Sequence, residues 1–220
     1  MMTKPSKKLK QSIIVFCEGA SEAAYIRFLK NEFRDVVAFR CYCDTDFFGN
    51  AERKLKKTPA LRDYTDEIDE VWFFFDVEMK DREKWSQRIR IIQQIRKLRK
   101  RQNIRVRLLM TTGCLEYWLL LHYKKIAPPI QTDEAKIQIL HDLLHEVPKY
   151  QKGDEDTTCQ IAVRYESAMT RAKQILASLL QDGLPGIDDS DTRNEWLCSQ
   201  CVTFSTVFEG IEHLQKLQTL

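Results

Sequence analysis

The chain has 220 residues, of which 43% are hydrophobic and 30% are charged, and its formal net charge is +3. This composition is that of an ordinary soluble protein with enough apolar residues for a substantial core, and it excludes extended disorder as the main state. The small net charge does not indicate nucleic-acid binding by itself, so the placement of charged residues along the chain has to decide.

The apolar segments of the chain are too short for a signal peptide or a membrane span. Residues 1–11 are mostly basic and polar and predict a flexible tail rather than a signal peptide, because the apolar run behind them ends at Glu18. The most apolar other run, Leu115–Tyr123, contains Glu116 and is far shorter than the roughly 20 residues of a membrane span. We therefore expect a cytoplasmic protein whose seven cysteines are reduced.

Apolar runs and helical periodicity alternate in the first half of the chain. Short apolar or alternating runs predict strands, and apolar residues at intervals of three or four predict helices between them. The predicted strands are Ser12–Cys17, Val36–Cys43, Val71–Phe75 and Ile104–Met110. The helices are expected after Gly19, around Ala51–Lys57 and over Asp81–Arg101. Such alternation indicates a parallel sheet with both faces covered.

Beyond Gly113 the pattern is helical and predicts no further strand. The expected helices are Cys114–Tyr123, Asp133–Glu146, Thr158–Gln181 and Thr206–Leu217, with a break at Gly183–Gly186. We therefore predict an α/β core over residues 12–125 and a helical C-terminal part over residues 126–220 that packs on this core.

Four acidic residues follow the predicted strands. Glu18 directly follows the first strand, and Asp76 and Glu78 directly follow the third. Glu116 lies in the first turn of the helix after the fourth strand. The carboxyl ends of parallel strands meet at one edge, and converging acids repel each other unless a cation lies among them. Carboxylate oxygens suit Mg²⁺ or Mn²⁺, so this edge is a predicted metal site. The alternative is that Asp76 caps a helix and Glu116 compensates a helix dipole.

Five segments together resemble the RloB-like branch of the TOPRIM superfamily, a set of prokaryotic proteins associated with phage defence. They are residues 13–30 (IIVFCEGASEAAYIRFLK, with a CEG-x-x-E-x-x-Y turn), 71–78 (VWFFFDVE), 111–123 (TTGCLEYWLLLHY), 150–154 (YQKGD) and 202–214 (VTFSTVFEGIEHL). They occur in the family's order over nearly the whole chain. There are two departures, because Glu78 replaces the second Asp of the family's D-x-D, and Thr112-Gly113 replaces its Asn-Pro.

The resemblance implies a TOPRIM-like parallel sheet flanked by helices and a Mg²⁺- or Mn²⁺-dependent nuclease that hydrolyses phosphodiester bonds of DNA or RNA. By position, Glu18 would transfer a proton or bind a second metal, and Asp76 and Glu78 would be the principal metal ligands. Glu116 would complete or orient the site, and Lys152 would contact the scissile phosphate. The family further implies a toxic effector of an abortive-infection system, with a neighbour-encoded ATPase or another sensor as its partner.

Basic residues are dense between Arg82 and Arg107. Such a cluster is typical of contact with a phosphate backbone, although a solvated helix face explains many of these residues equally well. Arg82 and Lys84 are the best candidates for nucleic-acid binding, because they begin the helix that leaves the acidic edge. Arg88 and Lys152 are further candidates.

Other readings of the sequence stay open. The altered acid pair would suit a non-catalytic module that binds nucleic acid or a partner ATPase, whereas primase-like polymerisation lacks a separate nucleotide-handling motif. His141 and His145 lie four residues apart but lack an obvious third zinc ligand. Cys41-x-Cys43 with Cys198-x-x-Cys201 suits packing as well as zinc binding. The sequence leaves the choice of DNA or RNA and the oligomeric state undecided.

Overall fold

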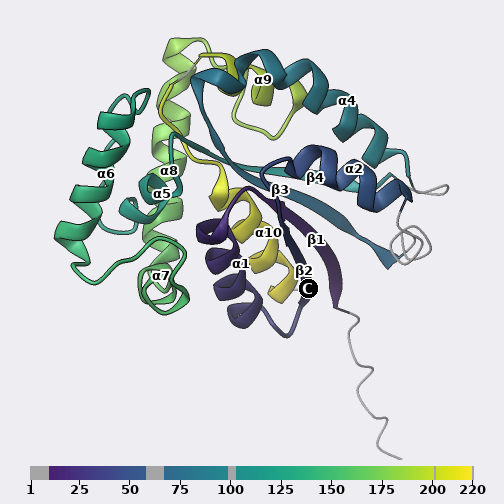
Figure 1. Cartoon of the computed structure of the whole chain (residues 1–220), viewed down its shortest axis with the longest axis horizontal. Helices are drawn as coiled ribbons and strands as arrows, with labels where there is room; N and C mark the ends of the chain where they lie inside the picture. Colours follow the sequence, from purple (N-terminus) through teal and green to yellow (C-terminus); the bar gives the residue numbers. More distant parts are fainter. Residues whose placement is uncertain (1–9, 58–66, 99–102, 201, 220) are drawn as a thin grey trace, which may run out of the picture.

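The computed structural model describes residues 10–57, 67–98, 103–200 and 202–219. The chain forms a four-stranded sheet in which every neighbouring pair of strands is parallel, with helices on both faces (Figure 1). The strands are β1 (Gln11–Cys17), β2 (Val37–Cys43), β3 (Glu70–Val77) and β4 (Arg105–Thr112). This confirms the predicted α/β class. Residues 1–9 of the predicted tail lie outside the described residues.

Helices follow each strand and continue through the second half of the chain. Those between and after the strands are α1 (Ala20–Glu32), α2 (Phe47–Lys57), the 3-10 turn η2 (Met79–Lys84), α4 (Trp85–Arg96) and α5 (Leu115–Leu120). The C-terminal part contains α6 (Asp133–Glu146), α7 (Glu155–Ala162), α8 (Tyr165–Ser178), the 3-10 turn η3 (Leu179–Asp182), α9 (Asp191–Gln200) and α10 (Val207–Thr219). None of these helices is long and apolar enough to cross a membrane.

The order of the strands changes direction between β1 and β3. The spatial order is β2-β1-β3-β4, so the chain passes from β1 to β2 on one side and later from β3 to β4 on the other. The reversal between β1 and β3 is the topological switch point at which open α/β sheets bind their ligands. The residues that follow these two strands are therefore the first place to search for a functional site.

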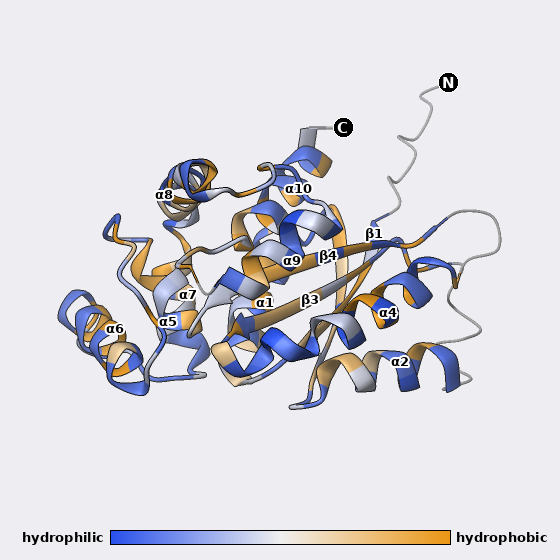
Figure 2. Cartoon of the chain, turned by 90° about the horizontal axis from the view of Figure 1, so that it is seen from above, coloured by the Kyte–Doolittle hydropathy of each residue, from blue (hydrophilic) through white to orange (hydrophobic). Residues whose placement is uncertain are grey.

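Alternate side chains of β3 fill the core on the two faces of the sheet. Phe73 stacks on Phe48 of α2, with ring centroids 4.2 Å apart. Phe74 meets Tyr25 of α1 edge to face at 6.2 Å, and Trp72 contacts His213 of α10. All five residues from Val71 to Phe75 are buried, which is why the strand reads as a continuous apolar run. Figure 2 shows β3 and β4 as largely hydrophobic, whereas the outer faces of α2 and α4 are hydrophilic.

Several element boundaries differ from the prediction. The ladder between β3 and β4 extends to the pairs Asp76–Thr111 and Val77–Thr112, so Asp76 lies inside the strand rather than directly after it. The predicted helix Asp81–Arg101 begins instead as the 3-10 turn η2 and becomes α-helical at Trp85. Residues 99–101 of that prediction lie outside the described residues.

The predicted helix Thr158–Gln181 is two helices and a turn. α7 ends at Ala162, α8 begins at Tyr165, and η3 follows α8. No glycine or proline marks the break, and Val163 between the helices is 65% exposed, so the apolar pattern alone does not reveal it. α9 was not predicted, because two of its four buried residues are the polar Arg193 and Asn194.

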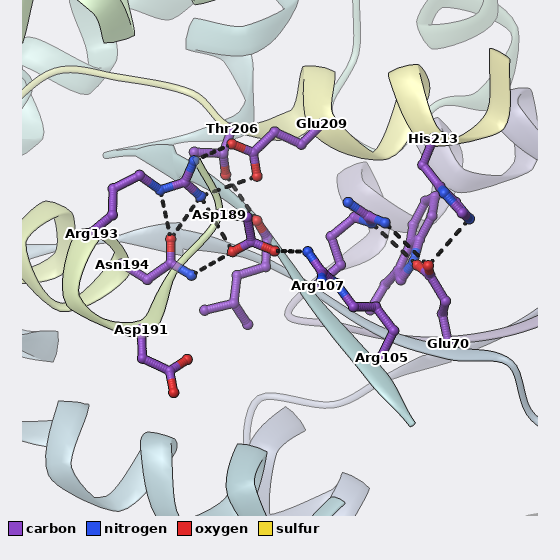
Figure 3. A network of polar contacts seen from close by, with 12 residues as sticks. Glu70, Arg105, Arg107, Asp189, Asp191, Arg193, Asn194, Thr206, Glu209 and His213 are labelled. Atoms are coloured by element: carbon purple, nitrogen blue, oxygen red, sulfur yellow. Dashed lines mark hydrogen bonds and ion pairs between the residues drawn. The ribbon is translucent and has the colours of Figure 1, made fainter. Parts of the chain in front are cut away.

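A polar network attaches α9 and α10 to the sheet (Figure 3). Arg193 of α9 is fully buried and forms an ion pair with Glu209 of α10. Asp189 accepts hydrogen bonds from Asn194 at 2.9 Å and from Arg105 of β4 at 2.9 Å. At residue 205 the chain before α10 also forms one antiparallel bridge with β4. These contacts pack part of the helical region directly on the sheet.

Candidate metal centre

One carboxylate lies on the turn between β1 and α1, and a second lies in the first turn of α1. Glu18 is half-buried, and burial raises the pKa of its carboxyl group, as do the charges of Asp81 and Glu78. The backbone N–H of Asp76 donates to this carboxylate, which lowers the pKa in part and ties the turn to β3. Glu22 stands three residues after Gly19, the residue that caps α1, and accepts from the Gly19 backbone N–H as in a capping box.

Glu22 is a buried acid that the sequence prediction did not include. Its side chain is 4% exposed, and burial raises its pKa to about 7, with Glu18 and Glu116 adding repulsion. A capping glutamate is normally in contact with solvent, so burial among other acids points to a further role. The signal for it was the second glutamate of the CEG-x-x-E-x-x-Y turn, at residues 17–25.

Asp76 lies at the centre of the acidic edge. Burial is the largest cause of its strongly raised pKa, followed by the charges of Glu22, Glu18, Glu116 and Glu78. Its Oδ1 atom is buried and has no hydrogen-bond partner among the residues that the structure describes. η2 begins after Glu78 without a side-chain cap, so Asp76 does not have the capping role that was the alternative. An unpartnered buried carboxylate oxygen costs several kcal/mol unless a cation binds it or the group takes up a proton.

Glu78 is paired with two lysines. It forms ion pairs with Lys80 on the same turn and with Lys136 of α6. Burial alone would raise its pKa, but the hydrogen bonds and charges of Lys136 and Lys80 outweigh burial, so the pKa is lowered and Glu78 is ionised. Glu78 is therefore held by lysines rather than left unpaired.

Glu116 is contacted by the loop that precedes α7. The Tyr150 hydroxyl donates to Glu116 Oε1 at 3.0 Å, and Lys152 Nζ lies 3.2 Å from Oε2. Gly153 has a φ of 75° and approaches α1 so closely that a Cβ atom there would lie 2.9 Å from that of Ala20. The loop is thereby fixed against the first turn of α1, which brings the C-terminal part of the chain to the acidic edge.

The arrangement fits a hard divalent cation in its donor type and in the unpartnered oxygen of Asp76. Glu18, Asp76 and Glu78 stay the predicted oxygen ligands for Mg²⁺ or Mn²⁺. No three carboxylates within the described ranges have ligand atoms as close as 4.8 Å to one another. Glu78 is paired with Lys80 and Lys136, so its binding to a cation would require it to exchange a lysine for the cation.

All the residues of the acidic edge lie within the part of the chain that matches a known protein family. The sequence model of a family described as RloB-like protein matches residues 13–213. The chain belongs to the RloB-like family. No curated protein and no solved structure matches it.

In this RloB-like protein the basic residues predicted to contact nucleic acid differ in their exposure to solvent. Arg88 is 6% exposed, lies 3.1 Å from Asp81 and packs over the rings of Phe47, Phe48 and Phe75. That position inside the core is a correction to its prediction as a nucleic-acid contact, because a buried guanidinium cannot reach a phosphate. Arg82 is exposed, and Lys84 is exposed while paired with Asp81 at 2.9 Å.

Other basic residues of the same cluster form structural ion pairs. Arg96 pairs with Asp191 of α9 at 2.7 Å, and Arg107 pairs with the buried Glu70 at 3.1 Å. These two arginines are therefore held by acids of the fold, whereas Arg82, Lys84 and Lys152 stay candidates for contact with a substrate. Lys152 itself is 59% exposed, which leaves it accessible to a substrate.

The histidine pair and the four-cysteine set, which the sequence offered as zinc sites, do not come together as such sites in the part of the chain that the structure describes. His141 and His145 are exposed on α6 and belong to no group of metal-binding side chains in the described part of the chain. Cys41 and Cys43 lie together with Cys17, and not with Cys198, which lies 3.6 Å from the sulfur of Met110. Cys201 lies outside the described residues.

Proposed function

We propose that this RloB-like protein is a Mg²⁺-dependent nuclease that hydrolyses phosphodiester bonds. The observation that carries the proposal is the buried, unpartnered Oδ1 of Asp76 among the carboxylates of Glu18, Glu22, Glu78 and Glu116. Such a group is unfavourable for folding unless it serves a purpose, and acids with strongly perturbed pKa values at a switch point of an α/β sheet are typical of active sites.

The bound Mg²⁺ would supply Lewis-acid polarisation of the phosphoryl oxygen and a site for the attacking water. The residues of the chain have separate tasks. Asp76, with Glu78, would hold the cation, and Glu18 would accept or donate the proton because its raised pKa lies closer to neutrality. Glu116 orients Lys152 at 3.2 Å, and the exposed ammonium of Lys152 would contact the phosphate.

The nuclease proposal is tested by incubating the purified protein with mixed DNA and RNA in Mg²⁺, Mn²⁺ or a chelator and mapping the ends produced. We expect cleavage only with the metals. Glu18→Gln and Asp76→Asn should keep the fold and slow cleavage about 100-fold or more, since a proton-transfer group contributes about 10²–10⁴-fold. Glu83→Gln, which changes an exposed acid on η2, should cleave like the wild type. Equal cleavage by all four proteins would overturn the proposal.

We further propose that the cleavage serves anti-phage defence by damaging the host's own nucleic acid. Expression of the wild type in a bacterial host should then arrest growth, whereas Asp76→Asn should not. A neighbour-encoded ATPase or another sensor is the expected regulator. Growth arrest by both proteins at equal expression would show that toxicity does not require the acidic edge.

A second candidate function is a non-catalytic module that binds nucleic acid. The observation in its favour is that Glu78 is occupied by Lys80 and Lys136, so that the edge lacks three carboxylates at ligand distance within the described residues. This candidate predicts binding that is insensitive to chelator and produces no ends. A gel-shift measurement made beside the cleavage assay distinguishes the two functions.

A further inference from the structure

Three cysteine side chains meet at the carboxyl end of the sheet, beside the acidic edge. Cys17 ends β1, and Cys41 and Cys43 lie on β2, with Cys17 opposite Cys43 in the register. Residues 41 and 43 are two apart on one strand, and paired residues of parallel strands point to the same side. All three side chains therefore leave the same face of the sheet.

The sulfur atoms are close enough to share one ligand. Sγ of Cys17 lies 3.6 Å from that of Cys41 and 2.8 Å from that of Cys43, and all three lie within 4.8 Å of one another. None of the three is in a disulfide. Two thiolates bound to one tetrahedral Zn²⁺ lie about 3.8 Å apart, as Zn–S bonds of about 2.3 Å require. The Cys17–Cys41 separation matches this distance already.

The surroundings suit a bound ion that retains an open position. Cys17 is buried, whereas Cys41 and Cys43 are exposed at the edge strand β2, so an ion has a route from solvent. The Gly19 carbonyl oxygen accepts from the thiols of Cys17 and Cys43 at 3.7 and 3.5 Å, so it lies beside the cluster. Cys43 would have to move about 1 Å away from Cys17, which its position at the exposed end of a strand permits.

We propose that Cys17, Cys41 and Cys43 form a binding site for a thiophilic ion of the Zn²⁺ class, with a fourth position left for the Gly19 carbonyl or for water. Thiolate ligands select such ions, whereas the carboxylates of the acidic edge select Mg²⁺ or Mn²⁺. The chain thus carries two sites of opposite preference that share the Glu18–Gly19 turn. The thiol site does not depend on the nuclease activity.

The site is tested by titrating the reduced, chelator-treated protein with Co²⁺ and then displacing it with Zn²⁺. Cobalt bound to thiolates absorbs by sulfur-to-metal charge transfer, and cobalt bound to carboxylates does not, so the acidic edge cannot give the same signal. We expect one equivalent of this absorption per chain, lost on addition of Zn²⁺. Native mass spectrometry should show the same single ion.

Variants at the exposed cysteines make the test specific. Cys41→Ser and Cys43→Ser should keep the circular dichroism of the wild type and lose about 100-fold or more in affinity, because even indirect partners of a metal ligand contribute 10–100-fold. Cys159→Ser is the matched control, since Cys159 is a free thiol on α7 outside the cluster, and it should bind like the wild type.

Three results would overturn the proposal. One is a charge-transfer signal that persists unchanged in both cluster variants. The second is reduced protein with all its thiols titratable that gives no such signal. The third concerns protein purified in air that has lost two cluster thiols and regains them with a reductant. If this protein still binds no ion after reduction, the cluster contains a disulfide-forming pair instead of an ion site.

Discussion

Burial disfavours the ionised form of the acids at the sheet edge. It is the largest cause of the raised pKa values of Glu18, Glu22 and Asp76, and repulsion between the acids adds to it. Glu78 shows the opposite balance, because two lysines outweigh its burial. A metal-free protein therefore holds some of these carboxyl groups protonated near neutral pH.

The Glu22 shift predicts how stability depends on pH. Its pKa is 4.5 in the unfolded reference and about 7 in the fold, so between these values the unfolded state releases a proton that the folded state keeps. The free energy of unfolding then falls as pH rises through this window, by about 3 kcal/mol for this group. In chelator, Glu22→Gln should remove this part of the fall, measured by denaturant unfolding at pH 5 and pH 8. Parallel pH profiles for the two proteins would contradict the assignment.

Gly113 explains one departure from the family at the level of a single residue. Its φ is 77°, and a Cβ atom there would lie 2.3 Å from a methyl carbon of Ile130. Proline holds φ near −65°, so the Asn-Pro that the resemblance implies at this position could not adopt this turn. The departure at Thr112-Gly113 thus changes the backbone that leads from β4 to Glu116, and it is not a neutral replacement.

At the scale of elements, the site depends on segments far apart in the sequence. α6 contributes Lys136 to Glu78, and the loop before α7 contributes Tyr150 and Lys152 to Glu116. The division into a core of residues 12–125 and a helical part of 126–220 stays a prediction. The structure adds that the second part completes the acidic edge.

Removing the lysine on α6 should free Glu78 for a cation. The pair is partly exposed, and such pairs contribute about 1 kcal/mol or less. We expect Lys136→Met to raise the affinity for Mn²⁺ by up to about fivefold, measured by isothermal titration calorimetry. Lys125→Met, at an exposed lysine between α5 and α6, is the control and should leave the affinity unchanged. A weaker affinity in Lys136→Met would show that the lysine supports the site instead of competing for it.

At the scale of the whole molecule, buried polar contacts join the C-terminal helices to one another and to the sheet, in addition to the apolar core. Glu70 starts β3 and accepts from Trp72 at 2.6 Å and from Arg107 at 3.1 Å. A second set of polar contacts, around Arg193, joins α9 to α10. A cavity of about 890 Å³ is lined by residues that include Glu70, Arg107 and His213. It lies at the amino end of β3, opposite the acids.

Loss of the Arg193 guanidinium should destabilise the whole fold. Arg193 is fully buried and Glu209 is 9% exposed, so Arg193→Met would leave a buried carboxylate without its partner, at a cost of about 3–5 kcal/mol. The double variant Arg193→Met, Glu209→Met should recover part of the loss. Arg96→Met, which breaks the half-exposed pair with Asp191, should cost about 1 kcal/mol or less. Denaturant unfolding measures all three, and equal losses for Arg193→Met and Arg96→Met would contradict the role given to burial.

The sequence by itself determined the elements whose pattern is local. The four strands and α6 follow directly from apolar periodicity, and the positions of Glu18, Asp76, Glu78 and Glu116 at one edge follow once the strands are parallel. α9 and the break before α8 were missed, because buried polar residues and a break without glycine or proline leave no apolar signal.

Only the tertiary structure decided which side chains are paired and which are not. The lysines on Glu78, the burial of Glu22 and of Arg88, and the meeting of Cys17 with Cys41 and Cys43 all join segments from different elements. Periodicity reports which face of an element is apolar, but it carries no information about which charged or thiol groups from other elements reach the same point. That depends on strand order and packing.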